Sequence, residues 1–313
     1  MRISVVIPAF NAASRLSRTI RSAEDAAEII IVDDGSTDAT AEIAESFEGA
    51  KVIRKKNSGV SAARNRGVEA ATGDYLCFLD DDDSLDSLSI LSGEEVPHEA
   101  PDMIILRSFI GGKERYPWKG IFDENTPYSP SDLLSRGYLR GSACGVLFRR
   151  KFLEDNAIRF AEGVRLGEDT VFFAEALSRA GSVMFRDLPL YLITPREGSA
   201  SRKPSETDIP CYADAIEAAI GRLPASPLRN LTVFKLIIVL TSRAAALRLG
   251  PGKAAEAARL RSGALPIKLD GISTERAKIR LLNFSYPLFY HLIALRDQLR
   301  GKPTGGKGVS ENM

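Results

Sequence analysis

The 313-residue sequence has few side chains that could cross-link it or bind a soft metal. It contains three cysteines, Cys77, Cys144 and Cys211, and two histidines, His98 and His291. All three cysteines stand in apolar surroundings, and neither their number nor their spacing suggests disulfides or zinc, which is typical of a protein of the reducing cytoplasm. Neither histidine has a partner pattern, so we interpret both as surface or packing residues.

An excess of charge and the common nucleotide-binding glycine motifs are also missing. The chain has 42 basic and 41 acidic side chains and a formal net charge of +1, so nucleic acid is not an expected partner. It contains neither a Gly-Lys-Ser/Thr P-loop nor a Gly-X-Gly-X-X-Gly element, which argues against a kinase or a dehydrogenase. The apolar run at residues 3–10 is short and is broken by Pro8, so we expect a strand there and no signal peptide.

Four consecutive aspartates follow an apolar, β-like run. Residues 75–79 read YLCFL and residues 80–83 read DDDD. Like charges at one strand end repel one another, so a hydrophobic core gives no reason for them. Hard oxygen ligands at this position suit Mg²⁺ or Mn²⁺, and ligands bind at the carboxyl edge of open α/β sheets. The alternative is a solvated acidic loop, which describes most acidic runs.

Three apolar runs precede the aspartates, and each leads into a helical pattern. The runs cover residues 3–8, 28–32 and 51–54, with Asn11 as the expected N-cap of the first helix and residues 60–71 as the third helix. Continuous apolar strands that alternate with helices predict a parallel sheet covered on both faces. The sequence therefore predicts an α/β fold in which Asp80 follows the fourth strand of a nucleotide-binding half.

Polar residues at three strand-to-helix turns would share one edge of this sheet. Asp33 and Asp34 follow the second strand, where a carboxylate can accept from a nucleobase N–H or a ribose hydroxyl. Arg64 lies in the first turns of the helix after residues 57–59, where free N–H groups and a guanidinium favour a diphosphate. Each feature has a bland alternative, turn chemistry or a surface charge, but all three in order at about 25-residue spacing argue against coincidence.

These segments resemble the motif series of family-two glycosyltransferases. The matching strings are SVVIPAFN (4–11), IVDDGSTD (31–38), NSGVSAARN (57–65), FLDDDD (78–83), GVLFRR (145–150), GEDT (167–170), Tyr191 and REGS (196–199). The resemblance covers residues 1–203 and implies the GT-A fold, inverting chemistry and a divalent metal, Mg²⁺ or Mn²⁺. Residues 204–313 match no motif that we can assign.

The resemblance also implies roles for individual residues. Asp80 and Asp82 would be the first and third positions of the Asp-X-Asp metal motif, with Asp82 as the direct ligand. The run of four aspartates leaves open which pair is in register. The nucleotide-sugar donor would be bound by residues from all the turns, namely Pro8, Ala9, Asp33, Asp34, Asn57, Arg64, Asp80 and Asp81.

Glycosyl transfer also needs a base that takes a proton from the acceptor hydroxyl. Glu168 and Asp169 follow Gly167 at the start of a helical segment with an apolar stripe. Acidic residues favour a helix N-terminus in any protein, so the pair has a structural alternative. The resemblance implies that one carboxylate of the pair is the base. We assign this role to Asp169, with Glu168 binding or orienting the acceptor.

The middle of the chain is less informative. Trp118 lies in a stretch rich in Gly, Pro and aromatic residues, where it could either stack on a sugar ring or cover the core. We expect separate strands at residues 183–185 and 190–193. Arg196 begins a polar loop that could close over the diphosphate.

The pattern becomes helical from residue 204. Residues 231–240 are apolar but too short to span a bilayer. Residues 281–295, broken by Pro287 and flanked by basic side chains, could pack on the core or form an interfacial anchor on an anionic membrane. We therefore expect a catalytic domain (1–203) with a nucleotide-sugar-binding half (1–100) and an acceptor-binding half (101–203), then a helical region (204–300) and a disordered tail (301–313).

The sequence thus predicts an inverting, metal-dependent glycosyltransferase. The expected donor is a UDP-sugar and the expected acceptor a saccharide or a lipid-linked oligosaccharide in surface-polysaccharide synthesis. The enzyme would act in the cytoplasm, with peripheral contact to the inner face of the plasma membrane. Two alternatives stay open: a haloacid-dehalogenase-type phosphatase, whose Asp-X-Asp-X-Thr/Val loop residues 80–84 loosely resemble, and a catalytically inactive sugar-nucleotide-binding protein.

Overall fold

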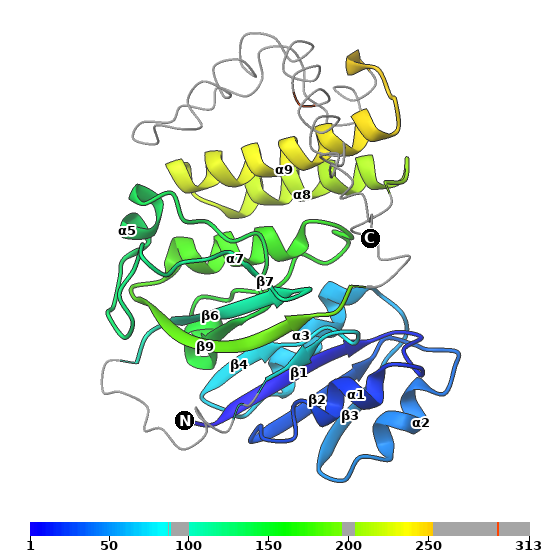
Figure 1. Cartoon of the computed structure of the whole chain (residues 1–313). Helices are drawn as coiled ribbons and strands as arrows, with labels where there is room; N and C mark the ends of the chain where they lie inside the picture. Colours follow the sequence, from blue (N-terminus) through cyan, green and yellow to red (C-terminus); the bar gives the residue numbers. More distant parts are fainter. Residues whose placement is uncertain (87, 89–99, 196–203, 253–292, 294–313) are drawn as a thin grey trace, which may run out of the picture.

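The fold is built on a mixed β-sheet whose two faces are covered by helices (Figure 1). The structure is a computed structural model that describes residues 1–86, 88, 100–195, 204–252 and 293. Within these residues the sheet has nine strands: β1 (Ile3–Ala9), β2 (Glu28–Asp33), β3 (Ala50–Arg54), β4 (Tyr75–Phe78), β5 (Ser84–Leu85), β6 (Met103–Ile110), β7 (Lys113–Arg115), β8 (Val146–Arg149) and β9 (Val183–Ile193). The helices are α1 (Leu16–Arg21), α2 (Thr40–Glu45), α3 (Val60–Ala70), α5 (Pro130–Ser135), α6 (Arg150–Asp155), α7 (Glu168–Arg179), α8 (Asp208–Arg222) and α9 (Pro227–Ala246).

The first four strands form the parallel half that the sequence predicts. They lie in the order β3-β2-β1-β4, and every pairing among them is parallel. The carboxyl ends of β1, β2 and β4 therefore meet at one edge of the sheet. This order brings the acidic run after β4 and the turn after β2 to the same edge of the sheet, on either side of the end of β1.

The second half of the sheet is mixed. The strand β8 joins β4 in antiparallel fashion, and β6, β9 and β5 continue the sheet outward from β8. The two strands expected at residues 183–185 and 190–193 are one continuous strand, β9, so that expectation was wrong. The register with β6 shifts near Arg107, opposite the residues RDLP (186–189) that separate the two expected strands.

Alternation of side chains along each central strand feeds two cores. In β1, Val5 and Ile7 point into a core shared with α1, whereas Val6 belongs to a larger core that includes α3, α7, α8 and α9. In β4, Cys77 and Phe78 divide in the same way. Continuous apolar strands are what a sheet buried on both faces requires.

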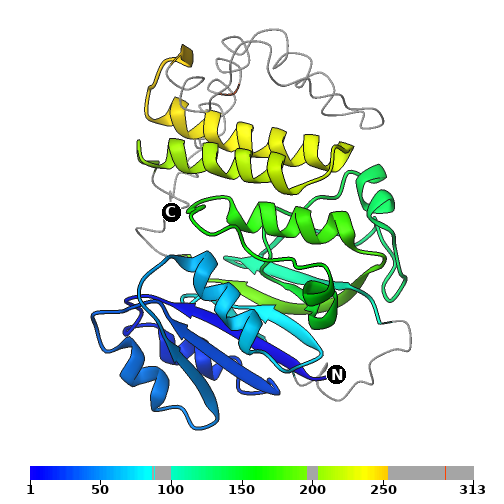
Figure 2. The same ribbon diagram turned by 180° about the vertical axis from the view of Figure 1, so that it is seen from behind.

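The helices α8 and α9 form a further layer over α7 (Figures 1 and 2). The apolar run at residues 231–240 lies inside α9, where Phe234 and Ile237 are buried in the larger core and Lys235 donates to the carbonyl of Leu139 (2.8 Å). Residues 281–295, the candidate anchor, lie outside the described residues except for Ile293, which is buried in that core.

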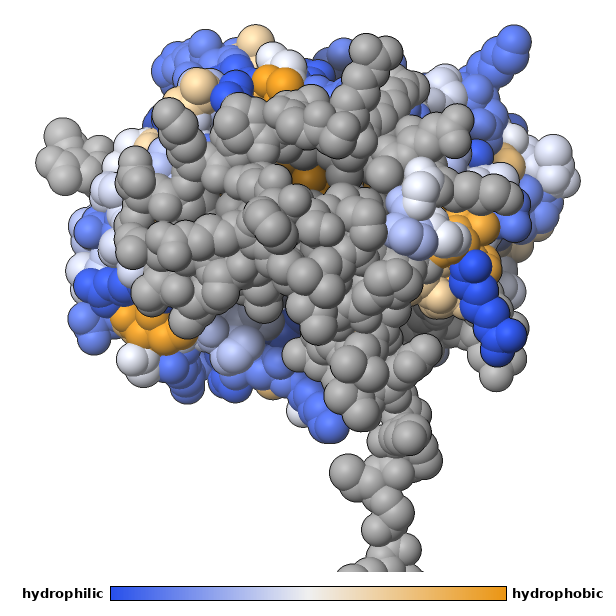
Figure 3. Space-filling model, turned by 90° about the horizontal axis from the view of Figure 1, so that it is seen from above, coloured by the Kyte–Doolittle hydropathy of each residue, from blue (hydrophilic) through white to orange (hydrophobic). Residues whose placement is uncertain are grey.

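Among the described residues, the large hydrophobic side chains that are exposed are Phe10, Ile121, Leu192, Ile220 and Val239. Of the described helices, none is both long and apolar enough to cross a bilayer. On the face seen in Figure 3, hydrophobic colour among the described residues gathers in small separate patches.

Asn11 does not cap the first helix, which corrects the sequence-based expectation. The helix α1 begins at Leu16, five residues further on, and Asn11 has a left-handed backbone with φ of 46°. Its side-chain oxygen accepts from the backbone N–H of Thr37 (2.9 Å). Asn11 therefore links the turns after β1 and β2, because Asn tolerates this backbone region better than most residues.

Gly67 allows α3 to approach β1 closely. A Cβ atom at this position would lie 2.2 Å from Cγ1 of Val6. We expect Gly67→Ala to destabilise the protein by about 1–3 kcal/mol, because the helix must shift to relieve the overlap. Urea unfolding should measure this loss. The control is Gly221→Ala in α8, where no atom lies within 4 Å and the substitution should be neutral or stabilising. Equal stabilities of the two variants would contradict the close packing of α3 on β1.

Candidate active site

The turn after β2 is tied to the loop that opens α3. The carboxylate of Asp34 is buried and accepts from the backbone N–H groups of Ser58 (3.0 Å) and Gly59 (2.7 Å) and from Nζ of Lys55 (2.6 Å). Asp33, also buried, accepts from the N–H of Ser36 (3.1 Å). Both oxygens of Asp34 are thus engaged by the protein, so in this structure the residue organises the loop rather than facing open solvent.

The end of β1 lies next to this turn. Pro8 and Ala9 are buried, and the N–H of Asp34 donates to the carbonyl of Ala9 (2.9 Å). Phe10, the next residue, is 45% exposed, which is unusual for a large aromatic side chain. Asn57 is exposed, and no side-chain hydrogen bond joins it to this cluster among those that the structure records. The edge therefore combines a rigid backbone with an accessible aromatic ring.

The acidic loop after β4 is held by side chains of α1 and of its N-cap residue, Arg15. Arg15 donates through Nε and Nη2 to the two carboxylate oxygens of Asp81 (2.9 and 2.8 Å). Arg18 donates to the main-chain carbonyl of Asp82 (2.6 Å), and Thr19 donates to the carbonyls of Asp81 and Asp83. These contacts assign Asp81 to the support of the loop and fix the direction of its neighbours.

The fourth aspartate ends the loop inside the protein. Asp83 is buried and accepts from the N–H of Thr194 (2.8 Å). Burial, together with the nearby charge of Asp80, raises the pKa of Asp83 to about 7. The four aspartates therefore lie in different surroundings, which the sequence alone does not reveal.

Arg64 joins the acidic loop to the pair at the start of α7. Its guanidinium is 3% exposed and donates to Oδ1 of Asp80 (2.7 Å), Oε1 of Glu168 (3.1 Å) and Oδ1 of Asp169 (2.9 Å). Burial alone would lower the pKa of this guanidinium, but the three carboxylates raise the pKa well above its usual value. The ring of Phe160 lies 5.0 Å from the guanidinium carbon. Residues more than 100 positions apart are thus joined through one cation.

Glu168 and Asp169 form the first turn of α7. Gly167 precedes them in a left-handed conformation with φ of 84°, which favours glycine. Burial, followed by the charge of Asp169, raises the pKa of Glu168 to about 7. Burial also raises the pKa of Asp169, although Arg64 opposes the shift. A carboxyl group with a pKa near neutrality is suited to accept a proton in a reaction at neutral pH.

Two residues of this site were missed by the sequence analysis, and a third, Tyr191, was named only as part of the motif series. Ser142 donates to Oδ2 of Asp169 (3.4 Å), Cys144 Sγ lies 3.7 Å from Oδ2 of Asp80, and the Tyr191 hydroxyl accepts from the N–H of Asp80 (3.1 Å). Burial raises the pKa of the Cys144 thiol well above its usual value, so the thiol stays protonated. Tyr191 and the string at 145–150 were part of the motif series, and they were the only signal that this region borders the site.

Other predicted residues lie elsewhere or outside the described part. Trp118 is buried against Phe185, with ring centroids 5.2 Å apart, so it covers the core and does not face a sugar site. Residues 196–203, expected to form a polar loop at the diphosphate, lie outside the described residues.

The acidic loop has the donor chemistry of a hard divalent cation. Asp80 is 34% exposed and Asp82 is partly exposed, and carboxylate oxygens are the ligands that Mg²⁺ and Mn²⁺ prefer. Within the part of the chain that the structure describes, no three His, Cys, Asp or Glu side chains are placed to hold an ion together. Mg²⁺ is commonly held by one or two carboxylates together with substrate phosphates, and Asp80 and Asp82 fit that pattern.

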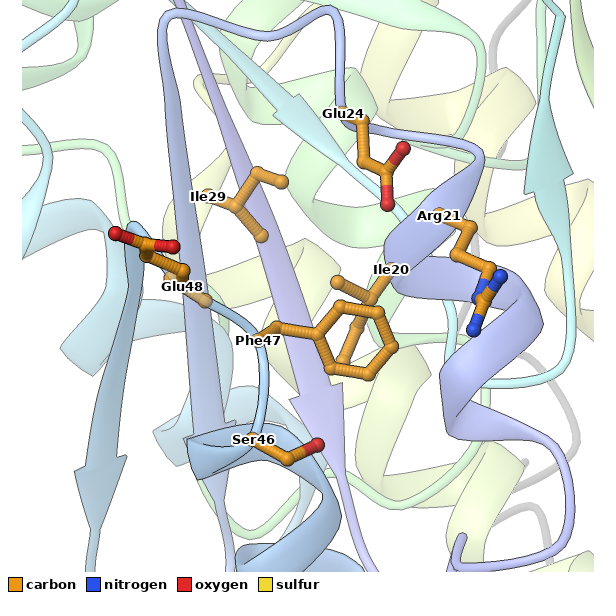
Figure 4. A pocket seen from close by; sticks show the side chains of 8 residues that line it. Ile20, Arg21, Glu24, Ile29, Ser46, Phe47 and Glu48 are labelled. Carbon is orange, nitrogen blue, oxygen red and sulfur yellow. The ribbon is translucent and has the colours of Figure 1, made fainter.

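A hollow of about 470 Å³ lies away from these residues (Figure 4). It is lined by residues from the ends of α1 and α2 and the starts of β2 and β3, namely Ile20, Arg21, Glu24, Ile29, Ser46, Phe47, Glu48 and Ala50. The Phe47 ring points toward Ile20 (Figure 4). Because the hollow is at the amino ends of β2 and β3, it is opposite the edge that carries the acidic loop and contains none of the predicted site residues.

The family model and curated relatives that match this sequence are glycosyltransferases or polysaccharide biosynthesis proteins. Residues 4–155 match the family model described as Glycosyl transferase family 2. The chain is 29% identical to the poly(ribitol-phosphate) beta-glucosyltransferase of Bacillus spizizenii over 259 residues, which are 78% of this chain but 40% of that protein. The chain therefore spans less than half the length of this relative.

Solved structures share the fold. S. aureus TarS 1-349 in complex with UDP-GlcNAc has a TM-score of 0.69 and 19% identity, with 96% of this chain and 92% of that chain covered. The mannosyltransferase PcManGT from Pyrobaculum calidifontis, in complex with GDP-Man and Mn²⁺, has a TM-score of 0.54 and 16% identity, with 96% and 88% covered. The predicted α/β architecture is thereby confirmed as the GT-A fold. The match of residues 4–155, which carry the series of motifs at the sheet edge, assigns this part of the chain to glycosyl transferase family 2.

Proposed function

We propose that this chain is an inverting, metal-dependent glycosyltransferase that moves a sugar from a nucleotide-diphosphate donor to a hydroxyl of a saccharide acceptor. The observation that carries the proposal is the meeting of two carboxylate sets at one sheet edge. Asp80 belongs to the acidic loop, Glu168 and Asp169 belong to α7, and Arg64 lies between them at 2.7–3.1 Å. A transferase needs both sets, one for the departing diphosphate and one for the attacking hydroxyl.

The donor would lie over the ends of β1, β2 and β4. Asp33, Asp34 and Asn57 would line the nucleoside end together with Pro8 and Ala9, and Phe10 offers an exposed ring beside them. Asp82 and Asp80 would hold Mg²⁺ or Mn²⁺, with Asp81 supporting the loop through Arg15. Such an ion, when bound, compensates the charge that develops on the leaving diphosphate. The complex of PcManGT with GDP-Man and Mn²⁺ supports the use of a divalent metal.

Asp169 would take the proton from the acceptor hydroxyl, and Glu168 would bind or orient the acceptor. The Ser142 hydroxyl and the Arg64 guanidinium hold the carboxylate of Asp169 from two sides. A base that acts from α7 while the nucleotide leaves over the acidic loop supports displacement from the face opposite the leaving group, which inverts the anomeric centre.

The comparisons suggest the classes of substrate. UDP-GlcNAc is bound to TarS, which supports a UDP-sugar donor, and the name of the B. spizizenii relative supports a surface polymer as acceptor. A lipid-linked oligosaccharide is a further candidate acceptor. We propose that residues 1–203 form the catalytic domain, with donor-binding and acceptor-binding halves at 1–100 and 101–203. Residues 204–300 would add the helical layer, with peripheral contact to the cytoplasmic membrane face through its last part.

Thermal shift with a panel of sugar nucleotides tests the donor proposal. UDP-sugars with Mn²⁺ should raise Tm by more than GDP-, CDP- or dTDP-sugars, and EDTA should remove the effect, because a ligand stabilises only the state that binds it. The control is the same panel with Asp34→Ala, whose loop loses the acceptor of two backbone N–H groups. A panel without any shift would contradict the proposed donor class.

We expect kcat/KM to fall on the acid side, at a pH above the usual range of a carboxyl group. A carboxylate base acts only when ionised, and burial raises the pKa values of both Glu168 and Asp169, so activity is full above the raised pKa of the pair and is lost below it. The limb belongs to the coupled pair. Glu168→Gln removes one negative charge beside Asp169 and should move the limb to lower pH. If the acid limb of the pH profile lies at the same pH in Glu168→Gln as in the wild type, Glu168 does not contribute to the ionisation that controls activity.

Two other functions fit less well. In a haloacid-dehalogenase-type phosphatase the catalytic loop normally follows the first strand, whereas residues 80–83 follow the fourth strand, β4, and Ser84 stands where Thr or Val is needed. An inactive sugar-nucleotide-binding protein has no use for the buried pair at the start of α7. Release of nucleotide from the donor by the wild-type protein would separate the enzyme from such a binding protein.

A further inference from the structure

The three contacts of Arg64 do not match those of a diphosphate ligand. The sequence assigned this residue to the donor, but its guanidinium is 3% exposed and its Nη atoms are engaged by Asp80, Glu168 and Asp169. Its Nε is buried and has no hydrogen-bond partner within the described part of the chain. Three of its five N–H groups serve carboxylates, and its burial leaves almost no accessible surface for a phosphate group.

We infer that Arg64 is a positioning residue that holds the Glu168–Asp169 pair ionised and aligned and couples it to the acidic loop. The inference rests on the proposed function, and it assigns Arg64 to the acceptor side of the reaction. One Nη atom donates to both carboxylates of the pair, and the other donates to Asp80. The planar fork of arginine can bridge three carboxylates in this way, whereas a lysine ammonium is a point charge.

The surroundings of the guanidinium favour this role. Its contact with the Phe160 ring and its burial exclude water, so the attraction between the charges is only weakly screened. Two adjacent, partly buried carboxylates, 12% and 20% exposed, would otherwise repel each other and favour protonated forms. Removing the cation should therefore raise the pKa values of the pair and loosen their side chains.

A second consequence is that the two halves of the site share one cation. Any ligand that draws Asp80 away from Arg64 leaves the guanidinium to the pair on α7. Donor binding at the acidic loop would then strengthen the ionised form of the base. Coupling of this kind is reciprocal between the two sites.

The test compares Arg64→Met with Arg66→Met, which removes an exposed arginine two residues further along α3 that pairs with Glu69 (2.9 Å). In Arg64→Met we expect kcat to fall by about 10²-fold or more and the acid limb to move to higher pH. The affinity for UDP with Mn²⁺, measured by calorimetry, should stay within about fivefold. The Arg66 variant should match the wild type in all three quantities.

Stability against pH gives a readout that needs no substrate. Without Arg64 the folded-state pKa values of the pair rise further above their unfolded values, so stability is lost as pH rises through that window. Arg64→Met should therefore lose more Tm at pH 9 than at pH 5.5, relative to the wild type at each pH. Arg64→Lys, which keeps the charge, should recover part of the loss at pH 9 but leave kcat at least about tenfold low.

Any one of three results would overturn the inference. One is a loss of UDP affinity as large as the loss of kcat/KM with kcat unchanged, which would make Arg64 a donor ligand. Another is a loss of Tm in Arg64→Met that is equal at both pH values. Wild-type kcat in Arg64→Lys would likewise remove the need for a bridge. Failure of the proposed function would appear differently, as a wild-type protein that binds no sugar nucleotide.

Discussion

Asp169→Asn is expected to lower kcat by about 10²-fold or more and to leave donor affinity within a few-fold of the wild type. Asparagine keeps the shape of the side chain. Its single carbonyl oxygen can still accept from Arg64, and its amide group can donate to the Ser142 hydroxyl. It cannot take a proton from a hydroxyl group, so the loss isolates the basicity of the carboxylate. Single-turnover kinetics at saturating donor, with donor Kd from calorimetry, would measure the two quantities separately.

Glu168→Gln is the matched comparison for this prediction. It removes the neighbouring carboxylate of the same pair, which also contacts Arg64 (3.1 Å). We expect a smaller loss of kcat and a change in acceptor KM, because Glu168 is assigned to binding and orientation. An almost inactive Glu168→Gln beside a nearly normal Asp169→Asn would show that the base is Glu168.

Asp82→Ala is expected to abolish transfer, with a loss of several kcal/mol of transition-state stabilisation. The leaving diphosphate would depart with its charge uncompensated once the proposed direct metal ligand is removed. The loop itself should persist, because Arg15, Arg18 and Thr19 hold it through Asp81 and main-chain carbonyls. Circular dichroism should therefore be unchanged while the transfer rate is at background.

The control for Asp82 is an aspartate at the other end of the same strand. Asp74 is exposed, lies just before β4 and accepts from the N–H of Arg2 (2.8 Å). Asp74→Ala should retain near wild-type activity. Full activity of the wild type in EDTA would remove the metal from the mechanism, whatever the Asp82 variant does.

The parallel half of the fold could be predicted from the sequence because its strands and helices follow local hydrophobic patterns. Each β-branched run of residues 3–8, 28–32 and 51–54 is a strand in the structure, longer than predicted by one residue at one end. Helix boundaries were less certain: Asn11 has the composition of an N-cap, but its side chain is used by Thr37 across two turns. Such a contact depends on how the turns are placed in space, and no local signal encodes it.

Site residues that belong to sequence motifs could be predicted, whereas contacts that depend on the three-dimensional fold could not. Asp80, Arg64, Glu168 and Asp169 could all be named from the sequence, yet their convergence on one guanidinium could not, because residue separation carries no distance. Cys144 illustrates the limit. Its apolar surroundings in the sequence gave no sign of a site, but the antiparallel pairing of β8 with β4 brings it beside Asp80.

The separate surroundings of the four aspartates were also hidden. The sequence gives four identical letters, and the register of the metal motif could not be chosen from them. In the structure Asp81 pairs with Arg15 and Asp83 is buried beneath Thr194. These contacts support the assignment of Asp80 and Asp82 to the metal, which rests on the resemblance.

The proposed metal-dependent donor site is tested most directly by calorimetry. The wild-type protein and Asp82→Ala would be titrated with UDP-sugars, with Mn²⁺ and then with EDTA. We expect at least one UDP-sugar to bind to the wild type in the presence of Mn²⁺. EDTA should abolish this binding, and Asp82→Ala should weaken it by at least about tenfold. Binding of equal strength in EDTA and in the variant would contradict a donor site built on the acidic loop.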